Sequence, residues 1–190
     1  MKARKIHLLF VVISLLILAC NSKENKIDAT RKTIIDKNDE VEKPSTFDSP
    51  CELVSIEDIK NTFAVAEYPI ETKDKILTHP TCMYKWEDGQ VFSIKKIANQ
   101  ELKMESPSEV LIVMVKKANE NKFNQSTKVY KQVQVISNVG DMAVWDSRMS
   151  QLTFLSNNYM FHVHVKVSNE EINNQKKAIE VSNLIIKKLK

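Results

Sequence analysis

Two histidines on one predicted strand are the residues best placed for metal chemistry. His162 and His164 stand two positions apart in the stretch FHVHV, and alternation along a strand puts both rings on the same face of a sheet. Zinc sites take three or four protein ligands, and after the first twenty residues the sequence offers one further histidine, His79. We expect an ordinary polar sheet face here, with a metal site as the alternative.

The three cysteines divide into a single residue and a pair. Cys20 ends an apolar segment, which leaves Cys51 and Cys82 as an even pair in the rest of the chain. In an oxidising compartment such a pair predicts a disulfide. Closing a loop of about 31 residues would stabilise the fold by roughly 3.5 kcal/mol in the chain-entropy model. Two buried free thiols or half of a metal site are the alternatives.

Two tryptophans are candidates for an aromatic binding surface, and enzyme signatures are missing from the sequence. Trp86 and Trp145 could present such a surface to a ligand or partner, but large aromatic side chains also belong in the core. The chain has two glycines, Gly89 and Gly140, and both fit turns. No phosphate-binding loop or nucleophile elbow can be built from that supply. We therefore expect a protein that is not an enzyme and holds no cofactor.

The charge of the chain gives little support to a nucleic-acid partner. The sequence has 28 Lys and Arg against 24 Asp and Glu, a net charge of +4. Three of the basic residues, Lys2, Arg4 and Lys5, stand in the first five positions. Without them the chain is close to neutral, whereas binding to a polyanion needs a clustered positive face.

The N-terminus has the layout of a secretory signal. The basic residues above precede an apolar run over residues 8–19, which is the order expected of a signal peptide. As a helix this run would be about 18 Å long, whereas a bilayer core is about 30 Å thick. A transmembrane anchor is therefore the weaker alternative.

The end of this run, ILAC at residues 17–20, resembles the lipobox of bacterial lipoproteins. The resemblance implies cleavage after Ala19 and acylation of Cys20, and several acyl chains hold a protein stably on a membrane. Asn21 stands where an Asp would imply inner-membrane retention, so an outer-membrane destination is implied. Residues 20–49 are rich in Lys, Asp, Glu, Asn and Thr, which predicts a flexible tether. The folded domain is then residues 50–190.

The first half of the domain predicts two helices and a hairpin. Ser55 and Asp58 have the spacing of a capping box. The stretch CMYKWEDGQVFSIKKI predicts a hairpin that turns at Asp88 and Gly89. A three-residue loop there gathers the apolar side chains on one face, namely Cys82, Tyr84, Trp86, Phe92 and Ile94. Ser106, with Pro107 and Glu109 after it, predicts a second helix up to about residue 122, although residues 110–115 would also suit a strand.

The second half predicts strands and a final helix. A turn is expected at Gly140 and Asp141, and a second hairpin is expected to turn at Asn157 and Asn158, because asparagine tolerates positive φ. One face of that hairpin would be apolar, with Leu152, Phe154, Tyr159, Phe161, Val163 and Val165. The other would be solvated, with Gln151, Thr153, Leu155, Met160, His162, His164 and Lys166. Ser168 and Glu171 predict a capping box for the last helix, whose inner stripe would hold Ile172, Ala178, Ile185 and Leu189.

This order of elements predicts an α+β fold, an antiparallel sheet of five or six strands covered on one side by helices. The segments SPCELVSIEDI, CMYKW and VGDMAVW, followed by the final helix, resemble a family of small secreted bacterial lipoproteins of unknown function. The resemblance covers about residues 49–190. It implies a PsbP-like fold, with Cys51 and Cys82 bridging the first helix region to the sheet, and it supplies no catalytic residues.

Together these observations predict a non-catalytic lipoprotein of the bacterial cell envelope, anchored through Cys20 and facing the periplasm or the surface. Its sheet, or a cleft between sheet and helices, would bind a protein partner or a small ligand. The alternative is an immunity- or inhibitor-type lipoprotein that blocks one incoming partner. A metal-binding or enzymatic role at His162 and His164 is the least favoured hypothesis.

Overall fold

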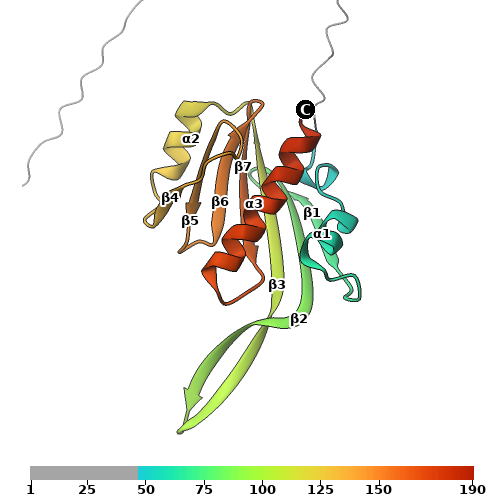
Figure 1. Cartoon of the computed structure of the whole chain (residues 1–190), viewed down its shortest axis with the longest axis vertical. Coiled ribbons are helices and arrows are strands. Elements are labelled where there is room, and N and C mark those ends of the chain that lie inside the picture. The colour runs from blue at the N-terminus through green and yellow to red at the C-terminus, as the bar shows by residue number, and fades with distance from the viewer. Residues whose placement is uncertain (1–46) are drawn as a thin grey trace, which may run out of the picture. The chain divides into compact units, whose positions relative to one another are not determined.

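The structure, a computed structural model, describes residues 47–190 (Figure 1). The predicted signal peptide, Cys20 and the predicted tether up to residue 46 lie outside the described residues. The elements in chain order are a 3₁₀-helix η1 (Pro50–Glu52), α1 (Ile56–Phe63), β1 (Glu71–Ile76), β2 (Pro80–Ile97), β3 (Gln100–Lys116), α2 (Glu120–Thr127), β4 (Val133–Val135), β5 (Met142–Asp146), β6 (Gln151–Ser156), β7 (Tyr159–Lys166) and α3 (Glu171–Lys188).

The strands form one antiparallel sheet in the order β1-β2-β3-β7-β6-β5-β4. The prediction of five or six strands is therefore wrong, since the sheet has seven. One of the strands that sequence analysis missed is β1, whose sequence ETKDKI is largely exposed and lacks an apolar face.

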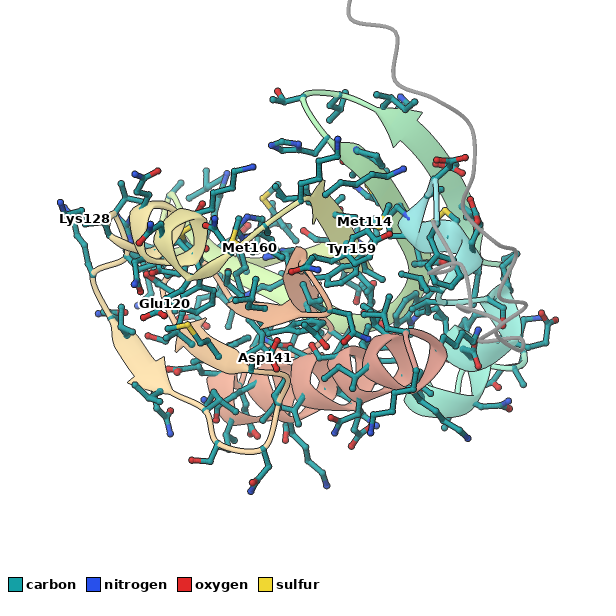
Figure 2. The ribbon with its side chains drawn as sticks, turned by 90° about the horizontal axis from the view of Figure 1, so that it is seen from above. Met114, Glu120, Lys128, Asp141, Tyr159 and Met160 are labelled. Atoms are coloured by element: carbon teal, nitrogen blue, oxygen red, sulfur yellow. A yellow bond between two sulfur atoms is a disulfide. The ribbon has the colours of Figure 1, made fainter. Side chains whose placement is uncertain are left out.

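Helices lie on both faces of the sheet, so the prediction of helices on one side is also wrong. The main core lies between the sheet and the helices α1 and α3. On the opposite face α2 covers a second, smaller apolar cluster (Figure 2), formed by Val115, Ala118, Phe123, Val144, Leu155 and Met160. The second cluster exists because residues 115, 144, 155 and 160 point away from the main core.

The predicted hairpin and helix over residues 82–122 are replaced by one long hairpin of β2 and β3. The strands pair from Thr81 with Val113 to Ile97 with Gln100, and the turn is Ala98 and Asn99, with φ of 49° and 67°. The predicted helix is wrong because residues 110–116 alternate between the core and the opposite face, as strands do. Only α2, capped by Asn119, is helical in this region.

Asp88 and Gly89 lie in a β-bulge, and not in the predicted turn. The register between β2 and β3 shifts between Trp86 and Val91, and Gly89 has the positive φ of 67° that an extra residue in a strand often needs. The bulge uses the same local sequence signal as a turn, which is why the sequence pattern alone placed the turn ten residues too early.

Several local predictions are confirmed. Ser55 and Asp58 form the capping box of α1. The β6–β7 hairpin turns at Asn157 and Asn158, both with positive φ, and its predicted apolar face belongs to the main core. The opposite face differs from the prediction, because α2 and the segment that follows it bury part of it.

The turn at Gly140 is also confirmed. A Cβ at this position would clash with the carbonyl oxygen of Leu155, so only glycine fits. The start of α3 is different from the prediction: its N-cap is Glu170, and no side chain caps it. Ile172 is 65% exposed and so does not lie on the inner stripe, which leaves Ala178 and Ile185 as the buried members of the predicted set.

The structure joins Cys51 and Cys82 in a disulfide with a Cα–Cα distance of 5.3 Å, so the predicted pairing is confirmed. The bond ties η1 to β2, and the hydroxyl of Ser49 donates to Asp74 of β1 at 2.8 Å. Asp48 pairs with Lys116 at the end of β3 at 2.7 Å. The start of the described chain is thus fastened to three strands.

Removing the disulfide should cost stability without changing the fold. We expect the double variant Cys51→Ala/Cys82→Ala to lose about 3 kcal/mol in the free energy of unfolding, because the unfolded chain regains loop entropy. Urea titration of the full chain in detergent measures this. Reductant should bring the natural chain to the level of the variant and leave the variant unchanged. Equal stability of the natural chain and the variant in the absence of reductant would contradict the prediction.

A projecting hairpin arm as the candidate binding surface

The two histidines of the sequence-based metal hypothesis have separate partners. The Nδ1 atom of His162 lies 2.9 Å from Thr153 Oγ1, whereas Nδ1 of His164 lies 2.7 Å from the carbonyl oxygen of Met149. Within residues 47–190, no group of three or more His, Cys, Asp or Glu side chains is placed to hold a metal ion. The described structure therefore offers the histidine pair no third ligand.

His162 instead belongs to a polar cluster between the sheet and the segment after α2. Tyr130 Oη lies 2.6 Å from Thr153 Oγ1, and Gln151 Nε2 donates to Tyr130 Oη at 2.5 Å. Burial, together with a smaller effect of the charge of His79, lowers the pKa of His162 to about 4. The cluster holds the Tyr130 segment against the sheet with a neutral imidazole.

The two tryptophans lie in the main core. Trp86 is 2% exposed and Trp145 is 1% exposed, so neither presents a ring face to solvent. Trp145 donates from Nε1 to Glu171 of α3 at 3.1 Å, and the ring of Trp86 lies 5.1 Å from that of Phe63 in α1. They stabilise the contact between sheet and helices, and the predicted aromatic surface is not formed by them.

Five of the thirteen exposed large apolar side chains in the described residues lie on one part of the β2–β3 hairpin, which no neighbouring strand accompanies. Strand β1 pairs with β2 only as far as Lys85, and β7 pairs with β3 only as far as Glu109. Residues 91–106, here called the arm, extend beyond the sheet (Figure 1). The arm exposes five large apolar side chains, with exposed fractions of 36% to 58%: Phe92, Ile94, Ile97, Leu102 and Met104.

Asp88 sets the direction of the arm at its root, which is the β-bulge between Trp86 and Val91. This carboxylate accepts hydrogen bonds from Trp86 Nε1 at 2.7 Å, from Ser108 Oγ at 2.8 Å and from the amide of Gln90 at 3.1 Å. Ser108 is fully buried. A bulge bends the strand that carries it, and here the bend is fixed to the core through Trp86 and Ser108.

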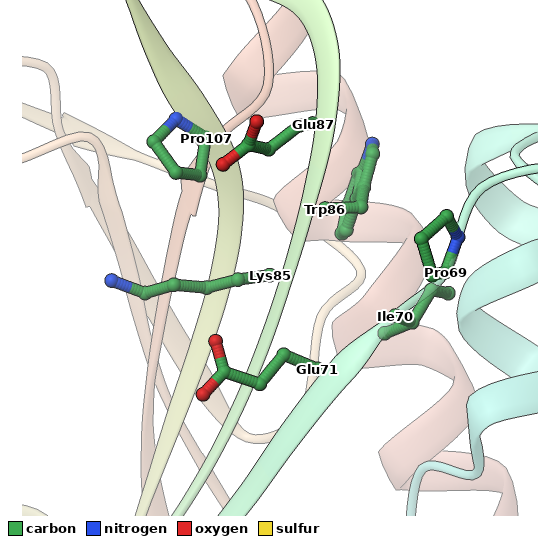
Figure 3. A pocket seen from close by; sticks show the side chains of 7 residues that line it. All are labelled: Pro69, Ile70, Glu71, Lys85, Trp86, Glu87 and Pro107. Atoms are coloured by element: carbon green, nitrogen blue, oxygen red, sulfur yellow. The ribbon is translucent and has the colours of Figure 1, made fainter.

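A groove of about 470 Å³ lies beside the root, where β1 begins opposite Lys85 of β2 (Figure 3). Glu71 and Lys85 extend to one side of the groove, while Pro69 lies near Trp86 on the other. The remaining lining residues are Ile70, Glu87 and Pro107. Lys85 is paired with Glu109 at 2.6 Å. The groove is thus a mixed polar and apolar surface next to the apolar arm.

The arm was not predicted, although the sequence carries one signal of it. The short stretches FSIK at residues 92–95 and LKME at residues 102–105 alternate apolar with polar residues, as half-covered strands do. Asn99, which tolerates positive φ, stands between them. The stronger Asp-Gly signal ten residues earlier obscured this weaker turn.

Comparison with known proteins gives no match to a protein-family model, to a curated protein or to a solved structure. The resemblance to secreted lipoproteins of unknown function stays a prediction. Within the described residues, none of the helices has the length and apolar character needed to span a membrane.

Loss of the Asp88 carboxylate should loosen the arm. In Asp88→Ala the buried hydroxyl of Ser108 and the indole of Trp86 lose their acceptor, which costs about 1–3 kcal/mol for each buried group left unpaired. We expect the arm amides that pair β2 with β3 to exchange hydrogen at least tenfold faster. Asp141→Ala, at an exposed aspartate in another turn, is the control. Unchanged exchange in the Asp88 variant would rule out this role.

Acid should weaken the fold through His162. The folded pKa of about 4 lies below the value of about 6.5 expected for an unfolded chain. The unfolded state therefore binds more protons between these values, and stability present above pH 6.5 is lost as pH falls toward 4. Between pH 7 and 4.5 the loss should be about 2 kcal/mol. Urea titration should show a flatter pH dependence in His162→Gln than in the control His164→Gln, and equal profiles would contradict this.

Proposed function

We propose that this chain is a lipid-anchored, non-catalytic protein of the bacterial cell envelope that binds a protein partner through the arm. The observation that carries the proposal is the exposure of five large apolar side chains on a hairpin that leaves the sheet. Large exposed apolar side chains gathered on one element in this way mark interaction sites in soluble domains.

Contact with a partner should stabilise the arm. A two-stranded hairpin without a third strand or a helix against it is marginally stable in water, and residues 91–106 have no further strand of the sheet beside them. Moving one large apolar side chain from solvent into an interface contributes about 1.5–3 kcal/mol. A partner that covers several of them therefore both binds and orders the arm.

A protein partner fits this surface better than a small ligand does. Small-molecule sites bury most of a ligand in a concave, mainly apolar cavity. The root groove has charged side chains on its walls, among them Glu71, Lys85 and Glu87. The inhibitor-type alternative uses the same element, because a narrow projecting hairpin can occupy a partner's own binding site.

The proposed anchor depends on the sequence alone. Cys20 at the end of ILAC would carry the lipid, and outer-membrane placement follows from Asn21 by the same resemblance. A native mass spectrum of the protein taken from its membrane in mild detergent reads both parts of the proposal, since it reports the lipid mass on Cys20 and any bound protein.

Polar substitutions on the arm should release the partner. In Ile94→Thr/Leu102→Thr, threonine keeps the preference for strand while most of the apolar contact is lost. We expect the bound fraction in the native mass spectrum to fall at least tenfold, since buried interface side chains contribute about 1–2 kcal/mol each.

The matched control is Ile76→Thr/Val135→Thr, which changes two apolar residues that are exposed by 81% and 75% outside the arm. It should keep the partner. Retention of the partner by the arm variant, or equal loss in both variants, would refute the arm as the binding element.

A further inference from the structure

We infer that the partner docks on one particular face of the arm. The docking surface of the partner carries a carboxylate that lies among apolar side chains and pairs with Lys95. The inference rests on the proposed function and gives the chemistry of the partner. It follows from the register of the two strands, from their ion pairs and from the state of the two strand edges.

The register assigns every arm residue to one of two faces. Residues that pair across two antiparallel strands point to the same face, so the pairs of β2 and β3 divide alternately. The leucine face carries Val91, Ser93, Lys95, Ile97, Gln100, Leu102, Met104 and Ser106. The phenylalanine face carries Phe92, Ile94, Lys96, Glu101, Lys103 and Glu105.

The leucine face has a continuous apolar stripe. Ile97 near the tip is a diagonal neighbour of Leu102, which is followed on β3 by Met104, and diagonal neighbours are within reach of long side chains. The stripe ends at Val91, which is buried at the root. The stripe therefore joins the exposed part of the arm to the packed body of the domain.

The phenylalanine face satisfies its own charges. Lys96 pairs with Glu101 at 3.4 Å, and Lys103 pairs with Glu105 at 2.7 Å. The Lys103 ammonium also lies 4.7 Å from the centre of the Phe92 ring. The basic and acidic groups on this face are matched within the arm, and its aromatic ring is partly occupied by the arm's own cation.

The leucine face has one charge, and that charge is unmatched. Lys95 lies directly opposite Leu102, and the ion pairs found in the described chain do not include it. An interface that covers Leu102 also covers the surroundings of this ammonium, and burial of an unpaired charge is costly. A partner surface that carries a carboxylate among apolar side chains would cover the apolar stripe and also pair with Lys95.

The edges of the arm are less suited to accept an added strand. On β2 the amide of Phe92 already donates to Asn169 Oδ1 at 3.2 Å. On β3, Pro107 lies at the base of the arm and has no N–H to donate to an added strand. Proline and lysine commonly prevent pairing at exposed strand edges. Docking through the side chains of a face is therefore favoured over pairing of backbones.

Site-specific cross-linking of the full chain in the cells that make it tests the choice of face. p-Benzoylphenylalanine replaces Leu102 on one face or Ile94 on the other, two positions of similar exposure. We expect at least a fivefold higher yield of a protein adduct from position 102. Equal yields, or a higher yield from position 94, would overturn the inference while leaving the proposed function intact. No adduct from either position would refute both, and a lipid adduct would identify a membrane surface as the occupant.

The charge is tested on the same adduct. A carbodiimide joins an amine to a carboxylate only when the two are in contact, so it should link Lys95 to an Asp or Glu of the cross-linked partner. Lys95→Gln should lower the adduct yield from position 102 at least fivefold, and the matched variant Lys96→Gln should lower it less than twofold. Equal effects of the two variants, or a carbodiimide link from Lys96 instead, would reject the carboxylate.

Discussion

The hydrogen bond from the Trp86 indole to the Asp88 carboxylate connects the main core of this protein to the arm. Trp86 packs against Phe63 of α1, and the Lys177 ammonium of α3 lies 5.6 Å from the centre of the same Phe63 ring. On its other side the indole holds Asp88, which in turn holds Ser108 of β3. Trp86 thus contacts α1 and the bulge directly, and it is linked to α3 through Phe63 and to β3 through Asp88. Burial of Trp86 fixes where the β2–β3 hairpin stops being sheet and becomes arm.

The parts of the fold that depend on neighbouring residues could be predicted. The Ser55 capping box, the Asn157–Asn158 turn and the glycine at position 140 each act within a few residues, and the structure has all three. The disulfide followed from counting cysteines, because two remained after Cys20 was assigned to the lipid.

The parts that depend on distant pairing could not be predicted. Asp88 and Gly89 satisfy a bulge as well as a turn, and Ser106, Pro107 and Glu109 have helix-capping spacing inside a strand. Which structure forms is decided by β7, which pairs with residues 109–116 from about 50 residues away in sequence. The arm itself was hidden for a further reason: alternation of apolar and polar residues looks the same in a covered strand as in an uncovered one.

The ion pair between Asp48 and Lys116 places the start of the described domain at one end of β3. Lys116 is the last residue of β3, and Gln100 beside the arm's turn is the first. At about 3.3 Å per residue the strand separates the two by about 50 Å. The chain therefore enters the domain at the end of the sheet away from the arm (Figure 1). The first described residues and the tip of the arm thus lie at opposite ends of β3. A partner that covers the arm, as proposed, would meet the domain at the end away from Asp48.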